Sequence, residues 1–177
     1  RGTAVGTVEN RLHGLDFRHV DHLTVEIESY KSLSDGAKYA ILLGSVFDAY
    51  ITCQKFDTIS DGLHINGPCS KIEVPFLRGT TGDDFVSLTG ADYPHYSDTS
   101  GDIIDVHVGT VIIDNARAGF KILAGAGNLI SNFSADTSFG TCQSYGAWVG
   151  ADTNYPDTSG GTYGYIDMGQ LFIKSGT

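Results

Sequence analysis

Short runs in which apolar and polar residues alternate recur along the chain and predict β-strands. Examples are 23–27 (Leu-Thr-Val-Glu-Ile) and 165–168 (Tyr-Ile-Asp-Met). An alternation of period two places every second side chain on the same face of a strand. Amphipathic helical spacing is almost absent. The best helical candidate, 37–47, is apolar on all sides and is more typical of a short buried strand.

The predicted strands belong to a repeat. The segment 50–67 contains a strand, a turn, a second apolar strand and a glycine, and the segment 72–90 follows the same order. A third copy covers 106–125 and a looser fourth covers 129–150, one more precedes them at 23–44, and 165–173 begins another. Asp61 and Asp84 occupy matching positions 23 residues apart, an interval typical of stacked solenoid coils.

These features predict an all-β fold, a right-handed parallel β-helix of about six coils. Successive coils should hydrogen-bond about 4.8 Å apart, so that inward side chains stack in ladders. The proposed ladders are Leu63 with Val86 and Phe120, and Ile65 with Leu88 and Ile122. The alternative is an antiparallel sandwich, but two-residue hairpin turns such as Asn-Gly are nearly missing.

The length of 177 residues favours a single domain, here one β-helix segment over 1–177. Two segments break the repeat, near 90–102 and 150–162, and both contain Gly-Ala-Asp, Tyr-Pro and Asp-Thr-Ser-Gly. Insertions at one corner of a solenoid leave on the same side and wall a groove there. Because the chain starts at Arg1 and still has a strand pattern at 171–173, we expect a piece of a longer protein.

Composition narrows the function classes. Eleven Lys and Arg against 21 Asp and Glu give a net charge of −10, which argues against nucleic acid as a partner. No apolar run reaches the roughly 18 residues of a membrane span, so no membrane insertion is expected. Three cysteines (Cys53, Cys69 and Cys142) without paired spacing are expected to be small buried residues.

The strongest candidate for chemistry is the carboxylate cluster Asp61, Asp83 and Asp84. In the predicted register Asp61 lies one coil below Asp84, so at least one pKa should rise well above the reference of about 3.9. One protonated and one ionised carboxyl group are what glycoside hydrolysis requires. Two alternatives stay open: ordinary turn chemistry of Asp-Gly and Gly-Asp, or a Ca²⁺ site.

Further candidates surround this cluster. Arg117 and Lys121, one coil beyond, could bind the carboxylate of an acidic sugar or hold one aspartate ionised. His64 should alternate outward beside Asp61, where it could contact the substrate. Tyr93 and Tyr96 of the first insertion could stack on sugar rings. No metal-binding histidine spacing and no dinucleotide-binding loop occur, so no metal and no cofactor are predicted.

The segments 60–65 (Ser-Asp-Gly-Leu-His-Ile) and 82–88 (Gly-Asp-Asp-Phe-Val-Ser-Leu) resemble the polygalacturonase family of glycoside hydrolases. In that family an Asn-Thr-Asp-Gly motif is followed one coil later by Asp-Asp. The resemblance implies that Asp61, Asp83 and Asp84 are catalytic, with Asp84 as the acid and the other two positioning water. Lys121 would match the lysine of the family's Arg-Ile-Lys segment.

The chain departs from this family pattern in three places. Ser60 and Ile59 replace the Thr and Asn of the first motif, a phenylalanine-containing stretch stands at the arginine position, and the intervening Gly-His-Gly coil has no counterpart. The resemblance covers roughly residues 50–127.

The glycine-rich, acidic coils also resemble the pectate-lyase-like β-helices of bacteriophage tailspikes. That resemblance implies a homotrimer on the virion that binds and hydrolyses bacterial surface polysaccharide outside the host cell. The alternatives are a non-catalytic glycan-binding or structural β-helix of a tail fibre or adhesin, and a secreted pectinase-like bacterial hydrolase. A lyase, with Lys121 as the base, is a weaker option.

Overall fold

The computed structural model describes residues 13–31, 38–92, 96–125, 127–151 and 160–176. Within them it contains strands and no helix, so none of these residues forms a helix that could cross a membrane. The strands are β1 (Leu15–Ile27), β2 (Tyr30–Lys31), β3 (Tyr39–Thr58), β4 (Asp61–Thr81), β5 (Asp84–Thr89), β6 (Ile103–Leu123), β7 (Leu129–Val149), β8 (Thr162–Tyr163) and β9 (Ile166–Ser175). All nine form one sheet.

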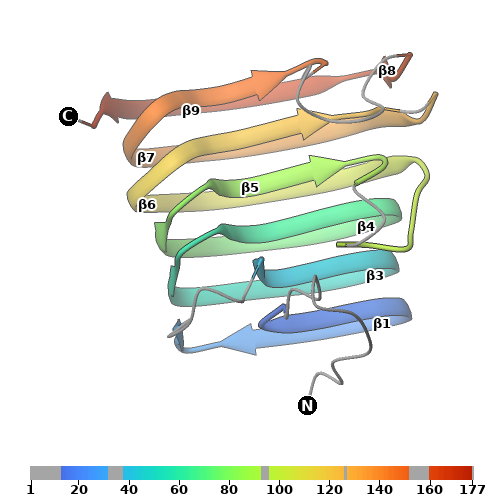
Figure 1. The fold of residues 1–177 in the computed structure, drawn as a ribbon, viewed down its shortest axis with the longest axis horizontal. Coiled ribbons are helices and arrows are strands. Elements are labelled where there is room, and N and C mark those ends of the chain that lie inside the picture. Colours follow the sequence, from blue (N-terminus) through green and yellow to red (C-terminus); the bar gives the residue numbers. More distant parts are fainter. Residues whose placement is uncertain (1–12, 32–37, 93–95, 126, 152–159, 177) are drawn as a thin grey trace.

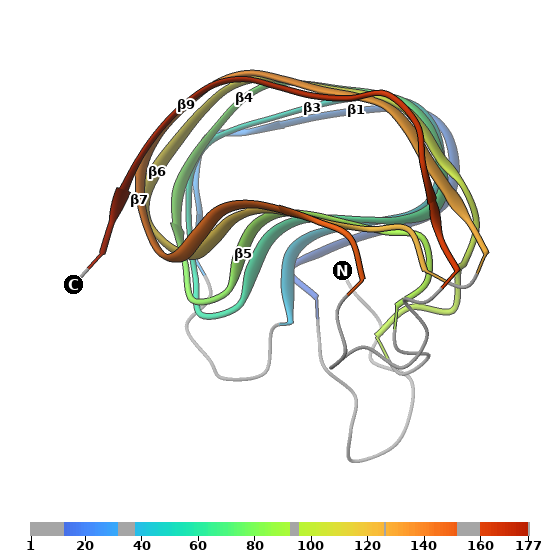
Figure 2. The same cartoon turned by 90° about the horizontal axis from the view of Figure 1, so that it is seen from above.

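The sheet winds into a stack of coils with β1 and β9 at opposite ends (Figure 1). Every pairing between named strands is parallel. Seen from the β9 end, the chain turns counterclockwise as it rises toward the viewer, which makes the winding right-handed (Figure 2). The predicted right-handed parallel β-helix is confirmed, and the antiparallel sandwich is excluded because a sandwich needs antiparallel neighbours.

Inward side chains stack in columns from coil to coil. Leu63 pairs with Val86 and Val86 with Phe120, while Ile65, Leu88 and Ile122 form the second predicted ladder. All six of these side chains are inaccessible to solvent. The three cysteines are also buried and unpaired, and burial raises the pKa of each thiol to about 11. The inside of the coil is therefore a continuous apolar core, held by burial rather than by disulfides.

One corner of the coil is turned by residues other than glycine. A single residue with positive φ stands there on each of five coils: His22, Asp48, Lys71, Asp105 and Asn132, with φ between 54° and 61°. Register pairs on either side of each residue place the five at equivalent positions. Asn and Asp tolerate this left-handed region better than other non-glycine residues. The repeat therefore bends by a recurring backbone conformation, not by a recurring glycine.

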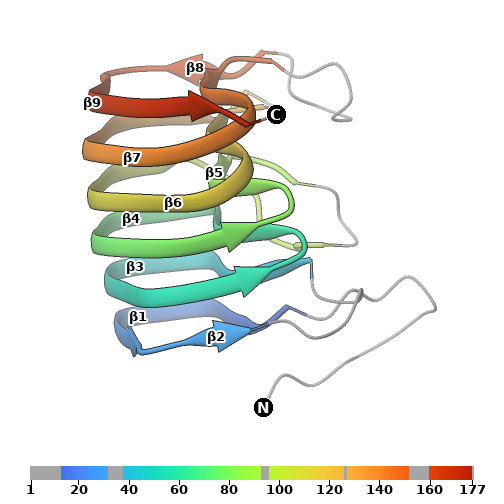
Figure 3. The same cartoon turned by 90° about the vertical axis from the view of Figure 1, so that its left-hand side faces the viewer.

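The two predicted insertions leave the sheet at equivalent positions. Leu88 pairs with Ile122, which pairs with Val149, and β5 and β7 both end within one residue of this column. The described parts of both insertions lie at the same corner of the coil (Figure 2). Residues 93–95 and 152–159 lie outside the described residues. The side view shows the coils stacked in order from β1 to β9 (Figure 3).

Candidate active site

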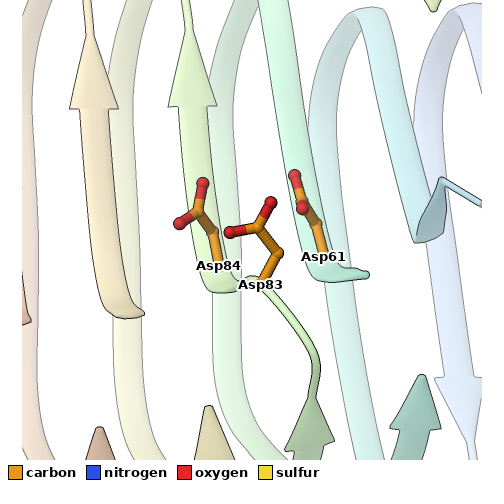
Figure 4. A group of neighbouring side chains, drawn as sticks. All are labelled: Asp61, Asp83 and Asp84. Atoms are coloured by element: carbon orange, nitrogen blue, oxygen red, sulfur yellow. The ribbon is translucent and has the colours of Figure 1, made fainter. Parts of the chain in front are cut away.

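Parallel register brings the three candidate aspartates together. Asp61 and Asp84 each begin a strand, and the residues two positions further on, Leu63 and Val86, pair directly. Asp83 is the last residue before β5, and all three carboxyl groups point to the same side of the coil (Figure 4). One oxygen atom of each lies within 4.8 Å of the others. Residues 23 positions apart in the sequence thus share one site.

The three carboxyl groups differ in their exposure to water. The side chains of Asp61 and Asp84 are 1% and 4% exposed, whereas that of Asp83 is 31% exposed. Removing a carboxylate from water disfavours its charged form unless a partner compensates. The state of each buried aspartate is therefore decided by its neighbours.

Asp61 has compensating partners. Nδ1 of His64 lies 3.2 Å from Asp61 Oδ2, and Nζ of Lys38 lies 3.4 Å from Asp61 Oδ1. Burial alone would raise the pKa of Asp61, but the hydrogen bond from His64 and the charge of Lys38 outweigh burial and lower it. Asp61 is therefore the carboxylate that stays ionised.

Asp84 has no such compensation. Its nearest described cation, Lys121 Nζ, is 3.9 Å away. Burial, the largest cause, and the negative charges of Asp61 and Asp83 together raise the pKa of Asp84 to about 8, and Lys121 and Lys38 only partly oppose them. Near neutral pH the site accordingly holds a protonated carboxyl group next to an ionised one.

Lys38 is the central cation of the site. Its ammonium bridges Asp61 and Asp83, at 3.4 and 3.8 Å, and its side chain is 11% exposed. Burial would lower the pKa of Lys38, but Asp61 and Asp83 more than compensate and raise it. Three acidic side chains at this spacing could also hold Ca²⁺ through oxygen atoms. The lysine ammonium already supplies positive charge to two of them, so this donor set fits a metal ion poorly.

His64 is not the exposed substrate contact that its outward position on β4 suggests. Its ring is 0% exposed and stacks on Tyr39 with ring centroids 3.9 Å apart. Its Nε2 lies 3.5 Å from Oδ2 of Asp92, an ion-pair distance, and Tyr39 donates a hydrogen bond to the same oxygen. The first insertion, which carries Asp92, covers the outward face at this point. His64 therefore holds Asp61 and does not face solvent.

The remaining predicted residues lie around the cluster at different depths. Nη1 of Arg117 lies 3.3 Å from Asp83 Oδ1, and the arginine side chain is 62% exposed. Tyr96 packs edge-on against Tyr39, with the ammonium of Lys38 5.4 Å from its ring centre. Lys121 is 12% exposed beside Asp84. Tyr93 lies outside the described residues.

Two residues of the site were missed from the sequence. Lys38 precedes Tyr39, which pairs with Asp61, so extending the repeat one coil toward the N-terminus would have found it. Asp92 lies within an insertion, where the repeat gives no register. Its contact with His64 depends on how the insertion folds back.

Two hollows on other faces of the coil are less suited to chemistry. A hollow of about 450 Å³ includes Glu73, His107 and Ser134, and another of about 620 Å³ includes Tyr50 and Phe76. Both are open and shallow, and neither contains a residue of the aspartate cluster.

No protein-family model, no curated protein and no solved structure matches this chain. The resemblance to polygalacturonases and tailspikes therefore rests on the short motifs and the repeat.

Proposed function

We propose that this chain hydrolyses glycosidic bonds in a polysaccharide. The observation that supports this function is the divergent pair of buried aspartates. The pKa of Asp84 is raised to about 8, while His64 and Lys38 lower the pKa of Asp61, one coil away. Two carboxyl groups with opposite protonation preferences are the acid and base that glycoside hydrolysis needs.

Each group has a defined role in the proposed reaction. Asp84 donates its proton to the glycosidic oxygen as the bond between that oxygen and the anomeric carbon breaks. Asp61 accepts a proton from a water molecule, assisted by Asp83, and the resulting hydroxide bonds to the anomeric carbon. Water is consumed, a new reducing end forms, and a proton passes from Asp61 back to Asp84 through solvent.

The proposed substrate is bacterial surface polysaccharide, and the proposed setting is a homotrimeric bacteriophage tailspike acting outside the host cell. The repetitive parallel β-helix and the net charge of −10 support this setting. Arg117 and Lys121 beside the acids favour a polymer that contains acidic sugars. A secreted pectinase-like hydrolase would use the same residues on pectic substrate.

The test measures reducing ends released from purified capsular polysaccharides, O-antigens and polygalacturonate. Asp84→Asn should abolish release, a loss of at least about a hundredfold, and should leave polysaccharide binding intact. Asp114→Asn, which changes a carboxylate that is paired with Arg78 and does not belong to the aspartate cluster, is the matched control and should retain activity. If Asp84→Asn turns over substrate as fast as the wild type, the cluster has only a structural or glycan-binding role.

A second pair of variants tests whether the charge of Lys38 next to the acids is needed for turnover. Lys38→Met removes the ammonium from Asp61 and Asp83 and should lower turnover, whereas Lys31→Met breaks an exposed ion pair with Asp57 and should not. Ultraviolet-absorbing unsaturated products in place of simple reducing ends would identify a lyase and contradict the hydrolytic mechanism.

A further inference from the structure

The only tryptophan of the chain lies close to the aspartate cluster. Along the outward face of the coil, Ser87 pairs with Lys121 and Lys121 pairs with Trp148. The neighbouring column runs from Asp84 through Ala118 to Tyr145. The column that starts at Asp84 and the column three residues further along the strands therefore both reach an aromatic residue on β7.

Trp148 and Tyr145 form an edge-to-face pair, with ring centroids 5.1 Å apart and an interplanar angle of 68°. This contact orients the indole and leaves at least one of its two faces uncovered by Tyr145. Trp148 is 38% exposed. Phe139 and Phe172, another exposed pair, differ because they stack at 9° and cover each other's faces. The geometry at Trp148 thus leaves an aromatic surface available to a flat ligand.

Ala118 and Lys121 lie on β6, between the cluster and this aromatic pair. Ala118 contributes only a buried methyl group, and Lys121 places its ammonium beside Asp84. Strands in a sheet lie about 4.8 Å apart and rise about 3.3 Å per residue, so Trp148 lies about 10 Å from Asp84 along the helix axis and about 10 Å from it along the strand direction. That distance corresponds to a short stretch of sugar chain lying across successive coils.

We propose that Trp148, oriented by Tyr145, is a binding subsite on which a pyranose ring of the polysaccharide stacks. The apolar C–H face of a sugar packs against the electron-rich face of an aromatic ring. The polymer then runs obliquely across the coils, with its scissile bond at Asp84 and a more distant sugar on Trp148. The direction of the polymer rests on the proposed hydrolysis at Asp84; the binding of sugar at Trp148 does not.

The fluorescence of the single tryptophan reports directly on this subsite. Asp84→Asn, which should bind without turnover, is titrated with size-fractionated oligosaccharides from capsular polysaccharides, O-antigens and polygalacturonate. At least one of them should change the emission and protect Trp148 from iodide quenching. An emission that responds to none of these sugars overturns the inference.

Variants that retain Asp84 then distinguish a loss of sugar binding at Trp148 from a loss of catalysis. Trp148→Ala should weaken binding measured by calorimetry about tenfold and raise KM with little change in kcat, and Trp148→Phe should recover much of the loss. Tyr165→Ala, which removes another exposed aromatic ring, is the control. Hydrolysis with an unchanged KM in Trp148→Ala refutes the subsite and leaves the proposed function standing. Sugar binding at Trp148 without hydrolysis by the wild type refutes the function and leaves the subsite.

Discussion

Asp61 and Asp84 occupy equivalent positions on adjacent coils, and their neighbours alone make them different. Asp61 meets the ring of His64 and the ammonium of Lys38 within 3.4 Å. Asp84 meets two other acids, with its nearest described cation at 3.9 Å. In a buried site such differences decide which carboxyl group keeps its proton. The backbone repeat supplies two similar aspartates, and the side chains around them assign different roles.

The pH dependence of hydrolysis follows from these two groups. Asp84 must be protonated, so activity should fall as the pH rises through about 8. Asp61 must be ionised, and because its pKa is lowered, activity should persist to a pH below the usual range of aspartate. The measurement is kcat/KM against pH for the wild type. A rate that stays constant well above pH 8 would contradict the assignment of Asp84 as the acid.

At the scale of the elements, the repeat in the sequence correctly predicted which residues of adjacent strands lie side by side. The 23-residue interval between β4 and β5 placed Leu63 beside Val86, and with it Asp61 beside Asp84. The alternation of side chains was also correct, since Leu63 points inward and His64 outward. What the alternation could not predict is whether an outward side chain reaches solvent. The first insertion, which carries Asp92, covers His64. The repeat gives no register for an insertion, so its contacts could not be predicted from the sequence.

The corner formed by positive-φ residues predicts which substitutions the coil tolerates there. Lys71 has φ of 56°, and a β-branched side chain fits this region poorly. Lys71→Val should therefore lower the free energy of unfolding by about 1 kcal/mol, measured by urea denaturation. Lys55→Val on β3, a strand position with no positive φ, should have little effect. Equal stability of the two variants would mean that the corner tolerates any residue.

At the scale of the whole molecule, stacking places functional groups in a line. The acids lie at the starts of β4 and β5, Lys121 lies on β6 and Trp148 on β7. Successive coils thus contribute positions to a row that crosses them obliquely. Since a polysaccharide is itself a linear repeat, a row of this kind can contact several of its sugars at once. Binding is then expected to strengthen with oligosaccharide length until the row is filled.

The same stacking builds an apolar column on another stretch of the coil. Ile112 pairs with Phe139 and Phe139 with Phe172, and the two phenylalanines are 44% and 56% exposed. The two rings adjoin and form an exposed apolar patch, a feature that can serve as a contact surface. We expect this column to lie between the subunits of the proposed homotrimer, where a symmetric assembly would repeat it three times.

Sedimentation equilibrium tests the assembly. The wild type should sediment at three times the 18.9 kDa mass of the chain. Phe172→Ser should lower the mass to that of one chain, because it puts a hydroxyl group in place of a ring that the interface must bury. Tyr50→Ser, at a residue 41% exposed on β3, should leave the trimer intact. A wild-type chain that stays monomeric at every concentration contradicts the trimer, whereas a trimer unaffected by Phe172→Ser places the interface elsewhere on the coil.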